Sequence, residues 1–179
     1  MIFDKTKAIH AILYIANKLM RSDFHKLFKI LYFSDREHLI TYGRTITGDR
    51  YIAMNDGPVP SNIYDIFKAV RGDGFYKDDG TFSRYFSVSD WDIVRPKIKA
   101  DTTELSRSDL HFIDECIEKY GNLSWDEIRE KSHDYAYRST TLNRPINFED
   151  IILEAGGDDE YIAYLREHSI LSNLHANGI

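Results

Sequence analysis

The chain has 179 residues, of which 42% are hydrophobic, so it is long enough for one buried core and short for two independent domains. Its net charge of −6, with acidic and basic residues interspersed, argues against nucleic-acid binding, because such domains usually carry a basic stripe. The single cysteine, Cys116, excludes an internal disulfide and a zinc site built on paired thiolates. Residues 1–20 fit neither a signal peptide nor a membrane span, so we expect a cytoplasmic protein without membrane contact.

The N-terminal part predicts a helical hairpin over residues 4–43. Asp4 is placed to cap a first helix that runs to about Met20, because apolar residues recur after it at helical spacing. A second helix begins at Asp23 and continues a three-and-four apolar pattern. It stops at Gly43, since glycine supplies the left-handed conformation that commonly ends a helix.

Over residues 49–95 the spacing of apolar residues is no longer that of a continuous helix, and we expect a strand, a turn, a helix and a small antiparallel sheet. Asp49 to Met54 alternates polar and apolar residues, which predicts a short strand. Gly57-Pro58-Val59-Pro60 is interpreted as a stiff turn that leads into a helix capped by Ser61. Asp78-Asp79-Gly80 predicts a hairpin turn, and the alternating residues after it predict the strands of the sheet.

The C-terminal part predicts four helices within residues 106–175. Ser106 opens one of them, and Ser124 opens the next with the spacing of a capping box. Asn147 and Asp158 are placed to cap the last two. No internal repeat or long linker divides the chain. We therefore predict an α+β fold, a mainly helical single domain spanning the whole chain, 1 to 179, with a small antiparallel sheet inserted between helices.

Seven histidines raise the question of catalysis. Asp35 and His38 are three residues apart on an expected helix, where a carboxylate can orient an imidazole. However, no G-x-S-x-G elbow is present, and Cys116 lies in an apolar helix pattern typical of an inert core thiol. The alternative role for the pair is to fix the helix to the strand after it. Five other histidines show no metal-ligand spacing and are assigned surface or boundary roles: His10, His25, His111, His168 and His175.

A second polar cluster contains His133, Asp134 and Tyr137, and it could meet His38 in space. It forms either a structural network or a contact with a ligand or partner, and the spacing leaves both open. No phosphate-binding glycine motif is present, so we expect neither a cofactor nor a metal. The rigid turn that follows the strand has a scaffold role by default, and it could also present Tyr51 and Tyr64 to a partner.

One stretch, residues 31–67, combines a leucine-aromatic helix, a YGR-x-I-x-GD segment, an aromatic strand and GPV before a tyrosine-bearing helix. The residues of this pattern are Leu31, Tyr32, Asp35, His38, Tyr42, Gly43, Arg44, Ile46, Gly48, Asp49, Tyr51, Ala53, Gly57, Pro58, Val59 and Tyr64. It resembles the Panacea, or SocA-like, antitoxin domain, and residues 105–140 look like the tail of that family. Two departures are Thr45, where a proline is common, and Tyr137, where a tryptophan is common.

The resemblance implies an antitoxin that neutralises a cognate toxin protein by direct contact, and it implies no enzymatic activity. We predict a tyrosine-rich, acid-flanked binding face around the strand, the GPVP turn and the third helix. Its acidity would speed encounter with a basic toxin. The candidate residues, for partner binding or as a structural core motif, are Asp35, His38, Tyr42, Arg44, Asp49, Tyr51, Gly57, Pro58, Val59, Tyr64, His133 and Tyr137.

Three alternatives remain open. Some relatives deliver a bound toxin to an ATP-dependent protease, so the protein could be a proteolytic adaptor. A small hydrolase or transferase could use Asp35, His38 and His133. A phage protein could reuse the domain to block a host defence factor, given the range of partners in the family.

Overall fold

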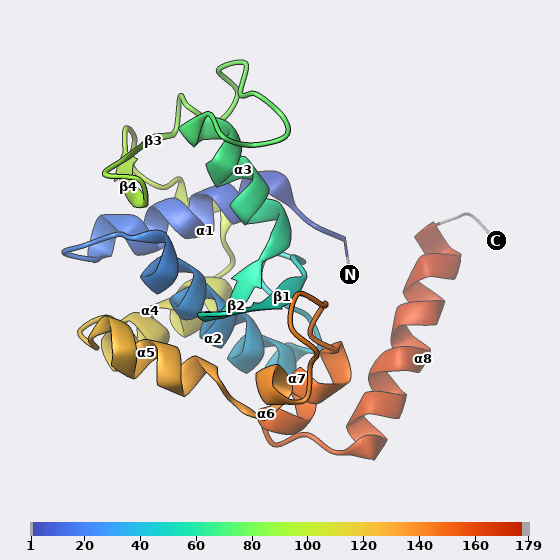
Figure 1. The fold of residues 1–179 in the computed structure, drawn as a ribbon. Coiled ribbons are helices and arrows are strands. Elements are labelled where there is room, and N and C mark those ends of the chain that lie inside the picture. The colour runs from blue at the N-terminus through green and yellow to red at the C-terminus, as the bar shows by residue number, and fades with distance from the viewer. Residues whose placement is uncertain (1, 177–179) are drawn as a thin grey trace.

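The computed structural model describes residues 2–176, with side chains for residues 2–168, and it shows a mainly helical α+β fold (Figure 1). This confirms the predicted fold class, while the assignment of the whole chain to one domain stays a prediction. The elements are α1 (Lys5–Lys18), α2 (Phe24–Tyr42), β1 (Tyr51–Met54), β2 (Gly57–Pro60), α3 (Ser61–Arg71), β3 (Phe86–Ser89), β4 (Ile93–Pro96), a 3-10 turn (Thr102–Glu104), α4 (Arg107–Tyr120), α5 (Trp125–Ser132), α6 (Tyr135–Arg138), α7 (Phe148–Glu154) and α8 (Asp159–Ala176).

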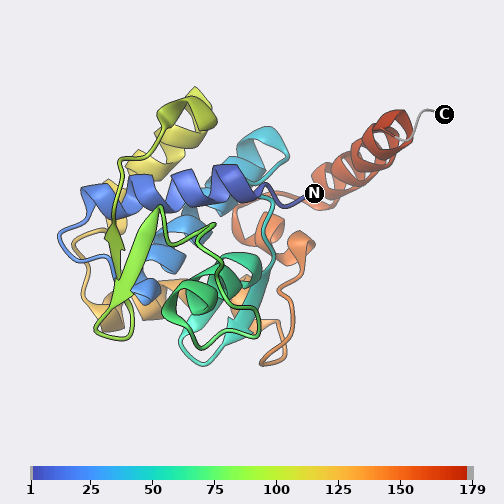
Figure 2. The ribbon, with the colours of Figure 1, turned by 90° about the horizontal axis from the view of Figure 1, so that it is seen from above.

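Helix α2 lies at the centre and packs against α1, α4, α5, α7 and β2 (Figure 1). Asp23 caps its start by accepting a hydrogen bond from Lys26 N at 2.9 Å, and Gly43 ends it with a φ of 70°. Its fully buried apolar residues are Leu27, Ile30, Leu31, Tyr32, Phe33 and Leu39. Seen from above, α1 lies across the body and α8 extends beyond it (Figure 2). The predicted first two helices and their caps are confirmed.

The predicted starts of the C-terminal helices are also confirmed. Ser106 forms a capping box with Asp109 at the start of α4, and Ser124 forms one with Glu127 at the start of α5. The caps of α7 and α8 come from the expected side chains as well, with Asp158 accepting from Tyr161 N at 2.8 Å in α8. These signals are local, because the capping side chain and the amides that it satisfies are three residues apart or fewer.

The interpretation of Gly57–Pro60 as a turn is wrong, because this segment is strand β2. It pairs antiparallel with β1, and the turn is the two residues Asn55 and Asp56 before it. Prolines are tolerated there because β2 has a strand neighbour on one side only. The other edge of β1 bonds to residues 143–146, through contacts such as Ala53 N to Arg144 O at 3.0 Å.

The predicted cap of α3 is also wrong. Pro60 occupies the N-cap position and makes no side-chain cap bond, while the carboxylate of Asp49 reaches the helix from the preceding loop. It accepts hydrogen bonds from Asn62 N at 3.0 Å, Asn62 Nδ2 at 2.8 Å and Ile63 N at 2.9 Å. Asp49 therefore satisfies the first amides of α3 and ties the helix to the start of β1.

The expected sheet after α3 differs in two ways. Its strands β3 and β4 form a sheet separate from β1 and β2, so there are two small sheets among the described residues. The predicted hairpin turn at Asp78 does not connect two strands. The Asp78 carboxylate accepts from Phe82 N and Ser83 N, and residues 81–85 form turns where a strand was expected. The hairpin turn lies at residues 90–92 instead, between Ser89 and Ile93.

We predict that Asp49→Ala lowers the free energy of unfolding by about 2 kcal/mol, because it leaves buried amides of α3 without an acceptor. Urea unfolding followed by circular dichroism measures this change. Asp65→Ala is the matched control on the same helix, since Asp65 is exposed and pairs with Lys68 at 2.7 Å, and it should cost less than about 0.5 kcal/mol. Equal losses in the two variants would contradict the capping role of Asp49.

Candidate functional site

The carboxylate of Asp35 is buried and holds the loop between α2 and β1. It accepts hydrogen bonds from Ile46 N at 2.7 Å, Thr47 Oγ1 at 3.2 Å and the hydroxyl of Tyr51 at 2.7 Å. Burial raises the pKa of Asp35 to about 6, although the hydrogen bonds from Tyr51, Ile46 and Thr47 act in the opposite direction. Asp35 therefore connects α2 with the loop and with the first residue of β1.

His38 belongs to a different network, centred on Asp109 of α4. Its Nδ1 donates to the carbonyl oxygen of Arg44 at 2.8 Å, and its Nε2 lies 3.1 Å from both Ser108 Oγ and Asp109 Oδ1. Lys7 Nζ lies 2.6 Å from the same buried carboxylate. Burial acts to raise the pKa of Asp109, but hydrogen bonds from His38 and Lys7 outweigh it and hold that pKa below its ordinary value. Helices α1, α2 and α4 meet at this carboxylate.

Among the described residues no hydrogen bond joins Asp35 to His38, and both are fully buried. Each bonds instead to the loop that follows α2, Asp35 through Ile46 N and His38 through Arg44 O, which is consistent with the alternative role of fixing the helix to the strand after it. His133 does not join them. Its ring stacks on Tyr137 with centroids 4.2 Å apart, and among the described residues it has no contact with His38. Asp134 instead accepts from the hydroxyl of Tyr32 at 2.9 Å, so it connects α6 with α2.

The candidate residues divide into buried and exposed groups. Tyr51 is only 3% exposed, which rules out the expected presentation of its ring to a partner. Tyr42 is exposed, while Val59 and Tyr64 are half-buried, and all three remain accessible. The buried candidates are Asp35, His38, Asp49, Tyr51, Gly57 and Pro58. The half-buried ones include Arg44, His133 and Tyr137.

Lys29 is a buried residue of the site that the sequence reasoning missed. It is 0% exposed, and its Nζ donates to the carbonyl oxygen of Pro58 at 2.9 Å, which attaches α2 to β2. The requirement for glycine at position 57 follows from this packing. A Cβ there would lie 2.5 Å from Ser132 Oγ and 2.9 Å from Lys29 Cε, and the φ of 101° is left-handed. The only sequence signal was a lysine placed between Phe28 and Ile30 in a strongly apolar helix.

Side chains of two further helices hold the turn between β1 and β2. The hydroxyl of Tyr137 donates to Met54 O at 2.8 Å, and Arg129 contacts Asn55 O and the Asp56 carboxylate at 3.3 Å each. The turn itself remains exposed. We call the accessible residues of this hairpin and of the start of α3 the hairpin face: Asn55, Asp56, Val59, Tyr64 and Asp65. It is a rigid surface, because α2, α5 and α6 each bond to the hairpin.

Two further properties of the described residues are relevant to a membrane or a metal-binding role. No helix there combines the length and apolarity that crossing a membrane requires. Within the same residues, His, Cys, Asp and Glu side chains form no group of three or more that could hold a metal ion. Cys116 is buried, and burial raises the pKa of its thiol to about 11, so it stays protonated at neutral pH.

Comparison with known proteins gives one match. A family model described as "Antitoxin SocA-like, Panacea domain" matches residues 27–136, which is more than half of the chain. The matched stretch begins in α2 and ends in α6, so it contains both sheets and α3. Neither the curated proteins nor the solved structures returned a match.

We predict a pH dependence of stability that originates at Lys29. Burial lowers the pKa of Lys29 from 10.5 to about 7; the charge of Asp56 opposes this shift and that of Arg129 adds to it. Between these two pKa values the unfolded chain keeps a proton that the folded chain has released, so folded-state stability rises with pH. From pH 7 to pH 9 this contribution amounts to about 2 kcal/mol.

Lys29→Met removes the titrating amine while keeping a side chain of similar length. Urea unfolding of both proteins at pH 7 and pH 9 should show that the variant lacks most of the gain seen in the wild type. Subtracting the gain of the variant from that of the wild type removes the contribution of the tyrosines and Cys116, because both proteins retain these groups. A gain of the same size in the variant would show that Lys29 titrates near its ordinary pKa in the folded protein.

Proposed function

The chain belongs to the SocA-like Panacea antitoxin family, and from this membership we propose that it neutralises a cognate toxin protein by direct contact. The family match is the observation that carries the proposal. We further propose that binding takes place in the cytoplasm and that the hairpin face provides part of the contact surface. No nucleic acid or membrane takes part.

The rigidity of the hairpin face supports this role. Lys29, Arg129 and Tyr137 bond to backbone atoms of the β1–β2 hairpin from three different helices. A surface that is already ordered loses little conformational entropy when a partner binds, which favours affinity. Its composition also suits protein recognition, since α3 contributes a partly exposed aromatic residue, Tyr64, and an exposed acid, Asp65, with Lys68 Nζ 4.8 Å from the centre of the Tyr64 ring and 2.7 Å from the Asp65 carboxylate.

We propose binding rather than catalysis for a geometric reason. The enzyme hypothesis required Asp35, His38 and His133 to act together on a substrate. Asp35 and His38 are 1% and 0% exposed, and each is occupied by structural hydrogen bonds. A substrate would have to displace the loop that follows α2 before it reached either residue.

We predict that co-expression restores growth to cells that make the product of an adjacent reading frame that is toxic alone. Asp65→Lys should weaken this neutralisation, because it reverses a charge on the hairpin face and slows association with a basic toxin. The affinity should fall by a factor of about three to ten. Growth and the association rate of the purified proteins provide the measurements.

Glu167→Lys is the matched control for this prediction. Glu167 is an exposed acid on α8, so the variant makes the same change in net charge at a place away from α3. It should neutralise the toxin as the wild type does. Equal weakening in both variants would mean that only the net charge matters, and no weakening in either would remove the hairpin face from the interface.

A separate measurement distinguishes masking from delivery to a protease. If the protein acts by masking, the half-life of the toxin stays unchanged or increases while the toxin is fully neutralised. Pulse-chase labelling in cells with and without the antitoxin measures it, and a strain lacking ATP-dependent proteases is the control. A shortened half-life that recovers in that strain would establish the adaptor role instead.

A further inference from the structure

The β1–β2 hairpin is attached to α2 by two basic side chains that are one helical turn apart. His25 Nε2 donates to the carbonyl oxygen of Asp56 at 3.3 Å, and Lys29 Nζ donates to that of Pro58 at 2.9 Å. The imidazole of His25 also stacks on Trp125 of α5, with ring centroids 4.5 Å apart. Because Nε2 of His25 donates to a carbonyl, the neutral ring carries its lone pair on Nδ1. A proton that His25 takes up therefore binds at Nδ1.

Two imidazole nitrogens near Lys29 are buried without a hydrogen-bond partner in the described part of the chain. They are Nδ1 of His25 and Nε2 of His133. An N–H at either place would be a buried donor without an acceptor, so each position suits the lone pair of a neutral ring. Burial, together with the charge of Lys29, lowers the pKa of His25 from 6.5 to about 4. Burial and the charges of Arg129 and Lys29 also lower the pKa of His133, so both rings are neutral at pH 7.

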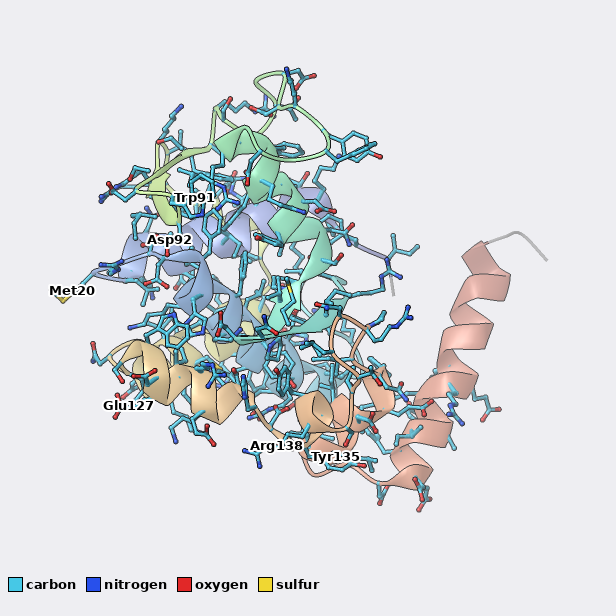
Figure 3. All side chains as sticks on the ribbon, viewed as in Figure 1. Met20, Trp91, Asp92, Glu127, Tyr135 and Arg138 are labelled. Carbon is cyan, nitrogen blue, oxygen red and sulfur yellow. The ribbon has the colours of Figure 1, made fainter. Side chains whose placement is uncertain are left out.

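Three carboxylates act on these basic groups, and each already forms an ion pair with an arginine. The pairs are Asp23–Arg21 at 3.4 Å, Asp56–Arg129 at 3.3 Å and Glu130–Arg138 at 3.3 Å. The Glu130–Arg138 pair is exposed, and Figure 3 shows Arg138 on the outside of the molecule, so solvent screens its charges. A positive charge added at His25 or His133 would therefore meet carboxylates that are already neutralised.

The hairpin turn can respond to such a charge at less cost than the helices can. Asn55 and Asp56 are exposed, whereas α2 and α5 contribute Leu27 and Ile128 to the core, both 0% exposed. Separating the helices would expose these apolar side chains to water. Lifting the turn breaks its polar contacts with α2 and α5 and lets water reach Lys29. Opening therefore begins at the turn.

We propose that the β1–β2 hairpin is held closed by the neutral imidazoles of His25 and His133, and that protonation of these rings in acid releases its turn from α2 and α5. The closed form binds these protons more weakly than the open form does, so closure weakens as the pH falls from 7 to 5. Lys29 is itself protonated over most of this range and adds repulsion. The device is a property of the fold. Only under the proposed function does an open turn disorder the hairpin face and weaken toxin binding.

Backbone hydrogen exchange on the full chain measures this opening. The protection factors of the β1 and β2 amides should fall about tenfold from pH 7 to pH 5, as the lowered pKa of His25 requires. At pH 5 the same amides should be about tenfold less protected than those of α4, because α4 exchanges only when the core opens. Equal protection of the hairpin and α4 at pH 5 would mean that only global unfolding exposes the hairpin, and the proposal would then be wrong.

A double variant, His25→Phe with His133→Phe, tests whether the two imidazoles are responsible. Phenylalanine keeps a ring against Trp125 and Tyr137 but takes up no proton, so the protection factors should change by less than about twofold between pH 7 and pH 5. His111→Phe is the matched control, because His111 is an exposed histidine of α4, and it should keep the tenfold fall. A tenfold fall in the folded double variant would refute the role of the two imidazoles.

If the double variant does not fold, titration of the wild type decides the question. NMR of the imidazole Cε1 protons should give midpoints below pH 6.5 for His25 and His133. Midpoints at or above pH 6.5 for both rings would overturn the proposal. None of these measurements uses the toxin, so their outcome is independent of the proposed antitoxin function.

Discussion

The fold depends on the polar residues that α2 places inside the protein. Lys29, Tyr32, Asp35 and His38 follow one another at intervals of three. Lys29 bonds to β2, Tyr32 to the start of α6, Asp35 to the loop before β1, and His38 to that loop and to α4. Because an α-helix turns by 100° per residue, each step of three rotates the direction of the side chain by about 60°. The four residues therefore point successively to β2, to α6, to the loop before β1 and to α4. One helix thereby fixes the positions of four segments that are distant in sequence.

These contacts contribute more to the choice of one conformation than to net stability. Moving a carboxylate such as Asp35 out of water opposes folding, and its raised pKa is the direct sign of that cost. The cost is offset only when Ile46, Thr47 and Tyr51 all donate to it. Alternative conformations of the loop would leave a buried charge without partners, and they are therefore disfavoured. The loop in turn sets the place of Asp49, and through it the start of α3.

The helix starts that depend on residues close together in the sequence were predicted correctly. Ser106, Ser124 and Asn147 were correctly identified as caps, because each satisfies amides of the helix that it begins. Ser61 was wrongly assigned as a cap because Asp49, twelve residues earlier, supplies the carboxylate, and local spacing carries no record of such a contact. Strand β2 was missed because of its composition. Its prolines are poor strand residues by propensity, and the pairing with β1 overrides that preference.

The candidate site was predicted less well than the fold, because residue type does not reveal burial. Tyr51 could equally lie on a surface or in a core, and only the buried carboxylate of Asp35 accounts for its inward direction. Lys29 was overlooked because lysine is almost never fully buried, so its apolar neighbours were assigned to the core without it. The family match covers the stretch that contains the motif, and the packing shows that most of the motif residues are buried.

In this arrangement buried and exposed residues have different roles. A change at Asp35, His38 or Asp49 disturbs segments on two or more elements, so such positions are constrained by folding whatever the partner is. A change at an exposed residue such as Asp65 or Trp91 alters the surface while the contacts of α2 remain intact. Under the proposed function, selectivity for the toxin is carried by exposed residues that contribute little to the core.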